Sequence, residues 1–167
     1  MSQPLWTPSP ERVEASNLTR FIRYVNESCG LELDGYDALY EWSVAEPERF
    51  WDRMWHFGGI VSSAPYTDVL ADPKMPGATW FPGAKMNFAE NLLRYRDESP
   101  ALVFVKEVGE ADGTLTYAQL YAQTAKFAQF LKEQGVTKGD RVAGFMPNRI
   151  ETVVDMRGAG RKGAIRS

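Results

Sequence analysis

The sequence contains very little cysteine and histidine, and this scarcity excludes several kinds of site. Cys29 is the only cysteine, so neither an intramolecular disulfide nor a zinc cluster of cysteines can form. A chain without disulfides is typical of a reducing compartment, and we expect a cytoplasmic protein. His56 is the only histidine, and no carboxylate is expected at ligand spacing on its face of the helix. We therefore expect His56 to be structural, because zinc needs three or four ligands and a catalytic base needs an orienting acid.

Long apolar runs and an excess of one charge are also missing. No stretch approaches the roughly 20 apolar residues of a membrane span, and the start, MSQPLWTPSPER, lacks the basic end and apolar run of a signal peptide. The net charge of −3 provides no attraction to nucleic acid or anionic membranes. Hydrophobic residues at 44% and charged residues at 25% are ordinary for a globular protein. The composition predicts a soluble, folded chain with no nucleic-acid and no membrane partner.

The clearest pattern in the sequence is a unit of helix and strand that spans residues 115–165. Thr116 and Gln119 have the spacing of a capping box, which predicts that a helix begins there. Gly135 is the expected C-terminal cap. Between them, a stripe at helical spacing consists of Tyr117, Leu120, Tyr121, Thr124, Phe127, Ala128 and Leu131.

The second half of this unit predicts a strand and another helix. The apolar run 141–146 ends before Pro147, which favours a buried strand, and Asn148 would cap the helix that follows. A helix, a strand and a helix in succession indicate a parallel sheet with crossover connections. Ligand sites in such sheets gather beyond the carboxyl ends of the strands.

The N-terminal third predicts helices with aromatic faces. Ser9 before Pro10 indicates a first helix, with a break where Asn17 could cap a second segment and a stop at Gly30. Residues 37–57 predict two further helices. Ser43 with Glu46 is the expected capping box between these two, and the expected apolar faces are Leu39 and Trp42, then Phe50, Trp51, Met54 and Trp55.

A long irregular segment covers residues 58–86, rich in glycine, serine and proline. We expect it to lie across a surface, pinned by Trp80, Phe81 and Met86. Asn87 with Glu90 then predicts a short helix over NFAENLLRY. The strand 101–105, a turn at 109–113 and the returning Leu115 predict a hairpin.

Several of these segments resemble the adenylate-forming ligases, the superfamily of acyl-CoA synthetases, luciferases and peptide-synthetase adenylation domains. The stretches LTYAQL, KGDRVA, MPN and GAI match the opening of the superfamily's large domain. YDALYEWSVAEPERFWDRMW is similar to the N-terminal helical segment of acetyl-CoA and acetoacetyl-CoA synthetases. WFPGAKMNFAENLL is similar to the acetoacetyl-CoA synthetase form of a motif that acetyl-CoA synthetases carry differently. The resemblance extends to about Met156.

The resemblance implies a parent enzyme that activates acetoacetate with ATP and Mg to an acyl-adenylate and passes the acyl group to coenzyme A. It also implies that the phosphate-binding loop, metal-binding acid, catalytic lysine and coenzyme A contacts lie beyond Ser167. We therefore expect an inactive N-terminal fragment with no catalytic, no cofactor-binding and no metal-ligating residue. The expected fold class is α/β: an N-terminal helical lobe with a long surface loop over residues 1–86, and over residues 87–167 an incomplete start of the AMP-binding domain.

Two other functions stay open. The chain could be a free-standing binding or assembly module, because a half-built domain exposes sheet edges and apolar faces. It could also bind a nucleotide, because residues 158–163 spell GxGxxG. That fingerprint works only as a turn from strand to helix, whereas the residues from Ile150 to Met156 predict a helix.

The last dozen residues depart from the family's aliphatic pattern. They carry three glycines and several basic side chains, namely Arg157, Arg161, Lys162 and Arg166. Two explanations compete at this point. Either the reading frame is degraded or shifted here, or these residues form a solvated tail on a shortened fold.

Overall fold

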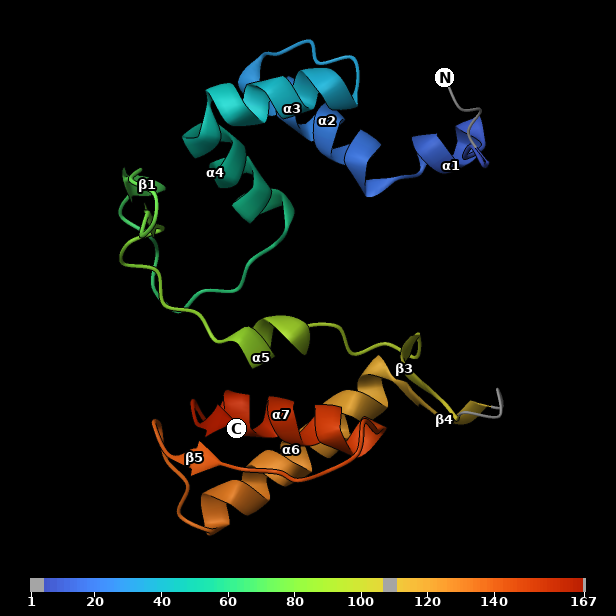
Figure 1. Cartoon of the computed structure of the whole chain (residues 1–167), viewed down its shortest axis with the longest axis vertical. Helices are drawn as coiled ribbons and strands as arrows, with labels where there is room; N and C mark the ends of the chain where they lie inside the picture. Colours follow the sequence, from blue (N-terminus) through green and yellow to red (C-terminus); the bar gives the residue numbers. More distant parts are fainter. Residues whose placement is uncertain (1–4, 107–110, 167) are drawn as a thin grey trace. The chain divides into compact units, whose positions relative to one another are not determined.

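The computed structural model describes residues 5–106 and 111–166, which fall into two compact units (Figure 1). The first unit comprises Met1–Ile60 and Tyr66–Gly83, and the second comprises Val61–Pro65 and Ala84–Ser167. Helix and sheet are both present, as the α/β prediction requires. No helix in the described part of the chain is both long enough and apolar enough to cross a bilayer.

The first unit contains four helices in its described residues: α1 (Pro10–Glu14), α2 (Asn17–Cys29), α3 (Tyr36–Ala45) and α4 (Pro47–Phe57). The break predicted near residue 17 is present, but its cap is Ser16, whose side chain accepts the N–H of Thr19. Gly30 ends α2 in the left-handed region at φ 66°, which a residue with a Cβ rarely adopts.

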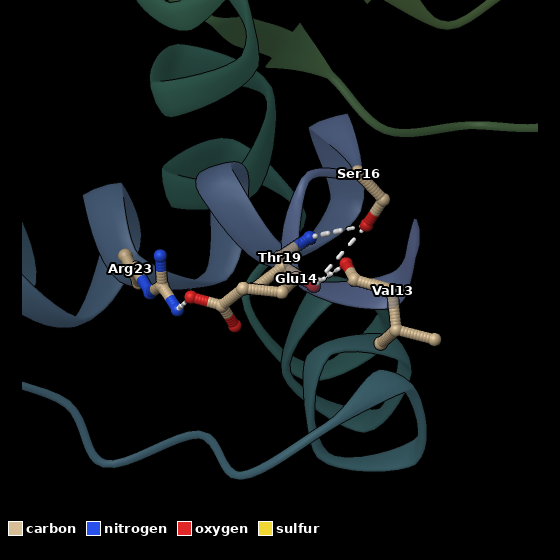
Figure 2. Close-up of polar contacts among 5 residues, drawn as sticks. All are labelled: Val13, Glu14, Ser16, Thr19 and Arg23. Carbon is tan, nitrogen blue, oxygen red and sulfur yellow. Dashed lines mark hydrogen bonds and ion pairs between the residues drawn. The ribbon is translucent and has the colours of Figure 1, made fainter. Parts of the chain in front are cut away.

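The junction between α1 and α2 is held by short polar contacts (Figure 2). The Thr19 hydroxyl donates to the carbonyl of Val13 at 2.7 Å, and the Ser16 hydroxyl lies 3.1 Å from that of Thr19. Arg23 forms an ion pair with Glu14 across the break. These contacts replace the backbone hydrogen bonds that a continuous helix would make.

Aromatic and aliphatic side chains of α2 and α3 form the core of the first unit. Phe21, Val25, Leu39 and Trp42 are its buried members. The Phe50 ring of α4 meets Phe21 edge to face at a centroid distance of 5.7 Å, a favourable geometry for aromatic pairs. The predicted face of α3, Leu39 and Trp42, is buried, whereas Trp51 of the face predicted for α4 is 43% exposed.

The predicted capping box between α3 and α4 is wrong. Ser43 lies inside α3, and its hydroxyl donates to the carbonyl of Tyr40 at 2.7 Å. Glu46 occupies the N-cap position of α4 without a side-chain capping bond. Pro47 at the first helical position has no N–H to satisfy, so α4 begins without that cap.

The segment after α4 is less irregular than predicted, because it contains the paired strands β1 (Leu70–Asp72) and β2 (Thr79–Trp80). Trp80 meets Trp51 of α4 edge to face at 5.9 Å, and Phe81 lies 4.7 Å from the Trp55 ring. These two residues pin the loop as predicted. Met86 does not contribute to the pinning, because 56% of its surface is exposed.

The second unit contains α5 (Phe88–Leu92), the strands β3 (Pro100–Val105) and β4 (Ala111–Thr116), and α6 (Tyr117–Glu133). The Asn87 side chain caps α5, which ends earlier than predicted. β3 and β4 pair antiparallel, so the hairpin is confirmed. Of the turn predicted at 109–113, residues 109 and 110 lie outside the described residues, and residues 111–113 belong to β4. The Thr116–Gln119 capping box is present with both of its hydrogen bonds.

A crossover unit follows, made of β5 (Arg141–Val142), α7 (Ile150–Arg161) and β6 (Ile165–Arg166). β5 and β6 pair in parallel, as predicted. The strand is shorter than the apolar run that predicted it, and Asn148 does not cap α7. Arg149 takes the N-cap position without a side-chain bond, while the Thr152 hydroxyl donates to the carbonyl of Pro147 at 2.7 Å.

Helix α7 packs closely against α6. Leu120, Thr124, Ala128 and Leu131 are buried on α6, and Val154, Gly158 and Ala159 are buried on α7. A Cβ built on Gly158 would lie 2.6 Å from the Phe127 ring and 3.4 Å from the backbone nitrogen of Ala128. The interpretation of these last residues as a solvated tail is wrong, because their glycine and alanine form the helix contact.

The glycine contact gives a direct stability test. We expect Gly158→Ala to lower the melting temperature, because overpacking a tight contact costs about 1 to 3 kcal/mol, more than the roughly 1 kcal/mol that alanine gains in a helix. Gly160→Ala is the matched control: its added Cβ would meet the Ala89 methyl at an ordinary 3.4 Å, so its melting temperature should be unchanged or higher. Thermal melting followed by circular dichroism measures both, and equal stability of the two variants would contradict the close packing.

Arg157 also lies on α7, and its charge is poorly accommodated. Its Nε and Nη1 are buried, with no hydrogen-bond partner among the described residues. Burial lowers the pKa of Arg157, since the charged form loses hydration, and Tyr117 opposes this only in part.

Replacing this side chain by an apolar one should stabilise the protein. We expect Arg157→Leu to raise the free energy of unfolding by about 1 to 3 kcal/mol, because unpaired buried polar groups carry a desolvation penalty of that order. Arg141→Leu removes the same charge from an exposed strand position and should change stability by less than about 0.5 kcal/mol. Urea unfolding of the three proteins measures the difference. A loss of stability in Arg157→Leu would show that the guanidinium is paired in solution.

Candidate functional site

The first unit contains a polar cluster around His56. The Tyr66 hydroxyl donates to Oδ1 of Asp52 at 2.5 Å and lies 3.2 Å from Nε2 of His56. Nε2 of His56 also lies 3.6 Å from Oδ1 of Asp52. The prediction that no carboxylate shares the face of His56 is therefore wrong, because Asp52 stands four residues earlier on the same helix and so on the same side.

The chemistry of this cluster favours a structural role. Asp52 also pairs with Arg53 at 3.2 Å. The hydrogen bond to Asp52, with burial and the carboxylate charge adding to it, raises the pKa of Tyr66 to about 12. A phenol that holds its proton so tightly is a poor general acid near neutral pH. The rings of Trp55 and Phe81 pack on Tyr66 at 5.2 and 5.3 Å, so the cluster fixes the loop to α4.

The first unit also contains an apolar groove, which is formed by side chains outside the polar cluster. It has a volume of about 440 Å³ and is lined mainly by apolar and aromatic side chains, including Leu18, Phe21, Tyr36, Tyr40 and Phe57. Tyr36 and Tyr40 stack at 6.2 Å and are 61% and 57% exposed. With few polar groups, the groove suits an apolar surface better than a charged substrate.

The second unit carries a polar pocket of about 230 Å³ where α5, α6 and α7 meet. Its lining consists of Asn87, Glu90, Leu93, Arg96, Tyr121 and Arg161. The guanidinium carbon of Arg96 lies 4.0 Å from the Tyr121 ring centroid, and that of Arg161 lies 5.2 Å from it. Nη2 of Arg161 donates to the Tyr121 hydroxyl at 3.4 Å. We call this set the arginine pocket.

The electrostatics of the arginine pocket are those of a cationic site. Arg161, through its hydrogen bond and then its charge, lowers the pKa of Tyr121, and the charge of Arg96 acts in the same direction. Neither arginine forms an ion pair with a carboxylate within the described ranges. Sequence analysis placed Tyr121 in the helix stripe and Arg161 in the tail, and nothing in the linear pattern brings them together.

The residues weighed as possible ligands or nucleotide contacts lie elsewhere. Gly158 and Gly160 are inside α7, so the GxGxxG string is not a strand-to-helix turn and the dinucleotide fingerprint is excluded. Cys29 is at the end of α2. In the described part of the chain, no group of three or more histidine, cysteine or acidic side chains could hold a metal ion.

Comparison with known proteins gives two family matches. The family model for the N-terminus of acetyl-coenzyme A synthetase matches residues 36–92, and the model for AMP-binding enzymes matches residues 88–167. The second match includes the glycine-rich and basic residues of α7, so the similarity continues through the segment that departs from the aliphatic pattern.

Individual proteins match over nearly the whole chain. An acetoacetyl-CoA synthetase of Rattus norvegicus is 38% identical over 166 residues, which are 98% of this chain and 24% of the relative. One of Rhizobium meliloti (strain 1021) is 38% identical over 163 residues, 98% of this chain and 25% of the relative. The solved acetoacetyl-CoA synthetase from Streptomyces lividans is 40% identical with a TM-score of 0.86, covering 99% of this chain and 26% of that one. The chain thus spans about a quarter of the length of these proteins.

The polar cluster of the first unit predicts a distinct pH dependence. Because the folded pKa of Tyr66, about 12, lies above the ordinary tyrosine value of 10.0, its hydrogen bond stabilises the fold fully below pH 10. That contribution is lost as the pH rises from 10 to 12. We expect Tyr66→Phe to be less stable than the parent at pH 8, with the difference shrinking above pH 10.

Denaturant unfolding at a series of pH values measures this difference. Tyr40→Phe removes a phenol that is 57% exposed and should follow the parent at every pH. A Tyr66→Phe difference that stays constant between pH 8 and pH 11 would show that the Asp52 hydrogen bond does not control this titration.

Proposed function

We propose that this chain, a homologue of the N-terminal quarter of acetoacetyl-CoA synthetases, is the N-terminal part of an ATP-dependent acid–thiol ligase. The observation that carries the proposal is the agreement of fold and sequence over nearly the whole chain, with a TM-score of 0.86 at 40% identity to the Streptomyces lividans enzyme. At that identity the likeness extends beyond a shared architecture, so a shared reaction is the best-supported function.

The proposed reaction has two steps. The carboxylate of acetoacetate attacks the α-phosphorus of ATP, which releases pyrophosphate and forms acetoacetyl-adenylate. The thiol of coenzyme A then displaces AMP and forms acetoacetyl-CoA. Both steps require water to be excluded and the reactants to be held in line.

The part played by these residues is to start the sheet and to support it. The crossover β5–α7–β6 builds a parallel strand pair on α6, and ligand sites in such sheets lie beyond the carboxyl ends of the strands. The chain would thus supply the scaffold on which later residues hold acetoacetate, ATP and coenzyme A. We also propose that the helical lobe ends at residue 86 and that the AMP-binding domain begins at residue 87.

Mg, which ligases of this type would use with ATP, is usually held by one or two carboxylates together with substrate phosphates and water. In residues 5–106 and 111–166, no group of three or more histidine, cysteine or acidic side chains could hold a metal ion. We assign no metal contact to this chain and propose that it is inactive by itself. We further propose a cytoplasmic location, in keeping with the single cysteine, and no nucleic-acid or membrane partner.

A second candidate function is a binding or assembly module without catalysis. The apolar groove of the first unit favours it, because its stacked Tyr36 and Tyr40 remain more than half exposed. Exposed aromatic surface of this kind marks interaction sites in soluble proteins. The ligase proposal assigns no role to this groove, so binding of a partner there is compatible with it.

A chimera tests the ligase proposal. Replacing the corresponding quarter of the Streptomyces lividans enzyme by these 167 residues should give a protein that makes acetoacetyl-CoA from acetoacetate, ATP and coenzyme A. The reason is that the two folds superpose over 99% of this chain. Acetoacetate-dependent exchange of pyrophosphate into ATP measures the first step, and thioester formation measures the second.

Two controls make the outcome decisive. A chimera carrying Leu120→Asp places a charge in the buried face of α6 and should lose activity through misfolding. The isolated 167-residue chain should support no exchange. A well-folded chimera without activity would refute the proposed role of the chain, and exchange by the isolated chain would refute the proposal that it is inactive.

A further inference from the structure

The arginine pocket has features that neither the fold nor the proposed ligase reaction uses. Arg96, before the β3–β4 hairpin, and Arg161, in the last turn of α7, both stand against the ring of Tyr121. Both are exposed, and neither is paired with a carboxylate in the described residues. Two unpaired guanidinium groups that line one small cavity are a recognised arrangement for binding anions.

The hydrogen-bonding capacity of Tyr121 adds to this arrangement. Its oxygen accepts a hydrogen bond from Nη2 of Arg161, which leaves its own O–H available to donate. The lowered pKa of Tyr121 makes that hydroxyl a stronger donor. A ligand in the pocket would therefore meet two guanidinium groups and one phenolic O–H.

The remaining polar residues limit what can bind. Asn87 is held in place, because Nδ2 donates to the carbonyl of Gly160 at 2.9 Å and Oδ1 accepts the N–H of Glu90 at 3.1 Å. It forms a fixed wall, and the second N–H of its amide is available to donate to a ligand. The Glu90 carboxylate also lines the pocket, where it opposes a second negative charge. The volume of about 230 Å³ is below that of sites for drug-sized ligands.

We propose that the arginine pocket binds a phosphate group, either as inorganic phosphate or as the phosphate of a small ester. A phosphate dianion offers the charge and the several acceptor oxygens that two guanidinium groups and a phenol require. The site rests on the geometry of the second unit alone and does not depend on the proposed ligase activity.

Titration of the full 167-residue chain with inorganic phosphate at constant ionic strength tests the proposal. Nitrogen-15 NMR of the arginine Nε–H groups should show saturable shifts for Arg96 and Arg161, with a dissociation constant of about 1 to 10 mM because both side chains are exposed to solvent. Sodium chloride at the same ionic strength should give no saturation. Glycerol phosphate in a parallel titration distinguishes the sources, since tighter binding than inorganic phosphate assigns the pocket to an ester.

Four pocket variants and one control variant make the result specific. Arg161→Ala and Arg96→Ala should each weaken phosphate binding about tenfold, and Tyr121→Phe, which keeps the ring but loses the donor, several-fold. Glu90→Gln should tighten binding several-fold, because it removes the opposing charge and keeps the shape of the side chain. Arg141→Ala deletes an arginine from an exposed position on β5 and should leave the dissociation constant unchanged.

Each outcome decides for or against the proposal. Circular dichroism and thermal melting establish that each variant is folded. If an arginine variant does not fold, the conservative Glu90→Gln and Tyr121→Phe pair decides on its own. Absence of saturation in the parent chain would show that the pocket does not bind phosphate. Equal weakening by Arg141→Ala and Arg161→Ala would show a general charge effect. Either result would overturn the site.

Discussion

The close approach of α7 to α6 at Gly158 determines most of the second unit. The glycine lets the backbone of α7 reach the Phe127 ring and the backbone of Ala128 without an intervening Cβ. With the helices this close, Val154 and Leu120 share one buried cluster, and the strands on either side of α7 are brought into parallel register. The same contact sets the end of α7 beside Tyr121, which creates the arginine pocket. A glycine that costs helix propensity therefore stabilises the fold through packing.

Local sequence patterns predicted those features that depend on a few neighbouring residues. The Thr116–Gln119 box, the caps at Ser9 and Asn87, the glycine stop after α2 and the β3–β4 hairpin all follow from short-range chemistry. Where two capping candidates compete, the pattern alone does not decide. Ser43 bonds back to its own helix, and the N-cap of α7 is Arg149, one residue after Asn148.

Most contacts in the candidate sites could not be predicted from the sequence, for a different reason. Asp52 and His56 could have been paired from their spacing of four on one helix, and this signal was missed. Tyr66, by contrast, reaches them only because the loop folds back on α4. The arginine pocket joins residues 96, 121 and 161 from three separate segments. Nothing in the linear order of charges indicates that Arg161 belongs with Arg96, since their proximity follows from the α6–α7 packing.

Two arginines one turn apart on α7 show that position within a helix determines whether an unpaired charge opposes folding. Arg157 lies in the interior of the helix, and its buried guanidinium nitrogens have no hydrogen-bond partner in the described structure, so its charge opposes folding. Arg161 is the last residue of the helix, where the unsatisfied carbonyls carry partial negative charge and favour a cation. Its head remains in water and rests against Tyr121. Arg161 can therefore stay unpaired at little cost, and an unpaired, hydrated guanidinium is one that can still bind an anion.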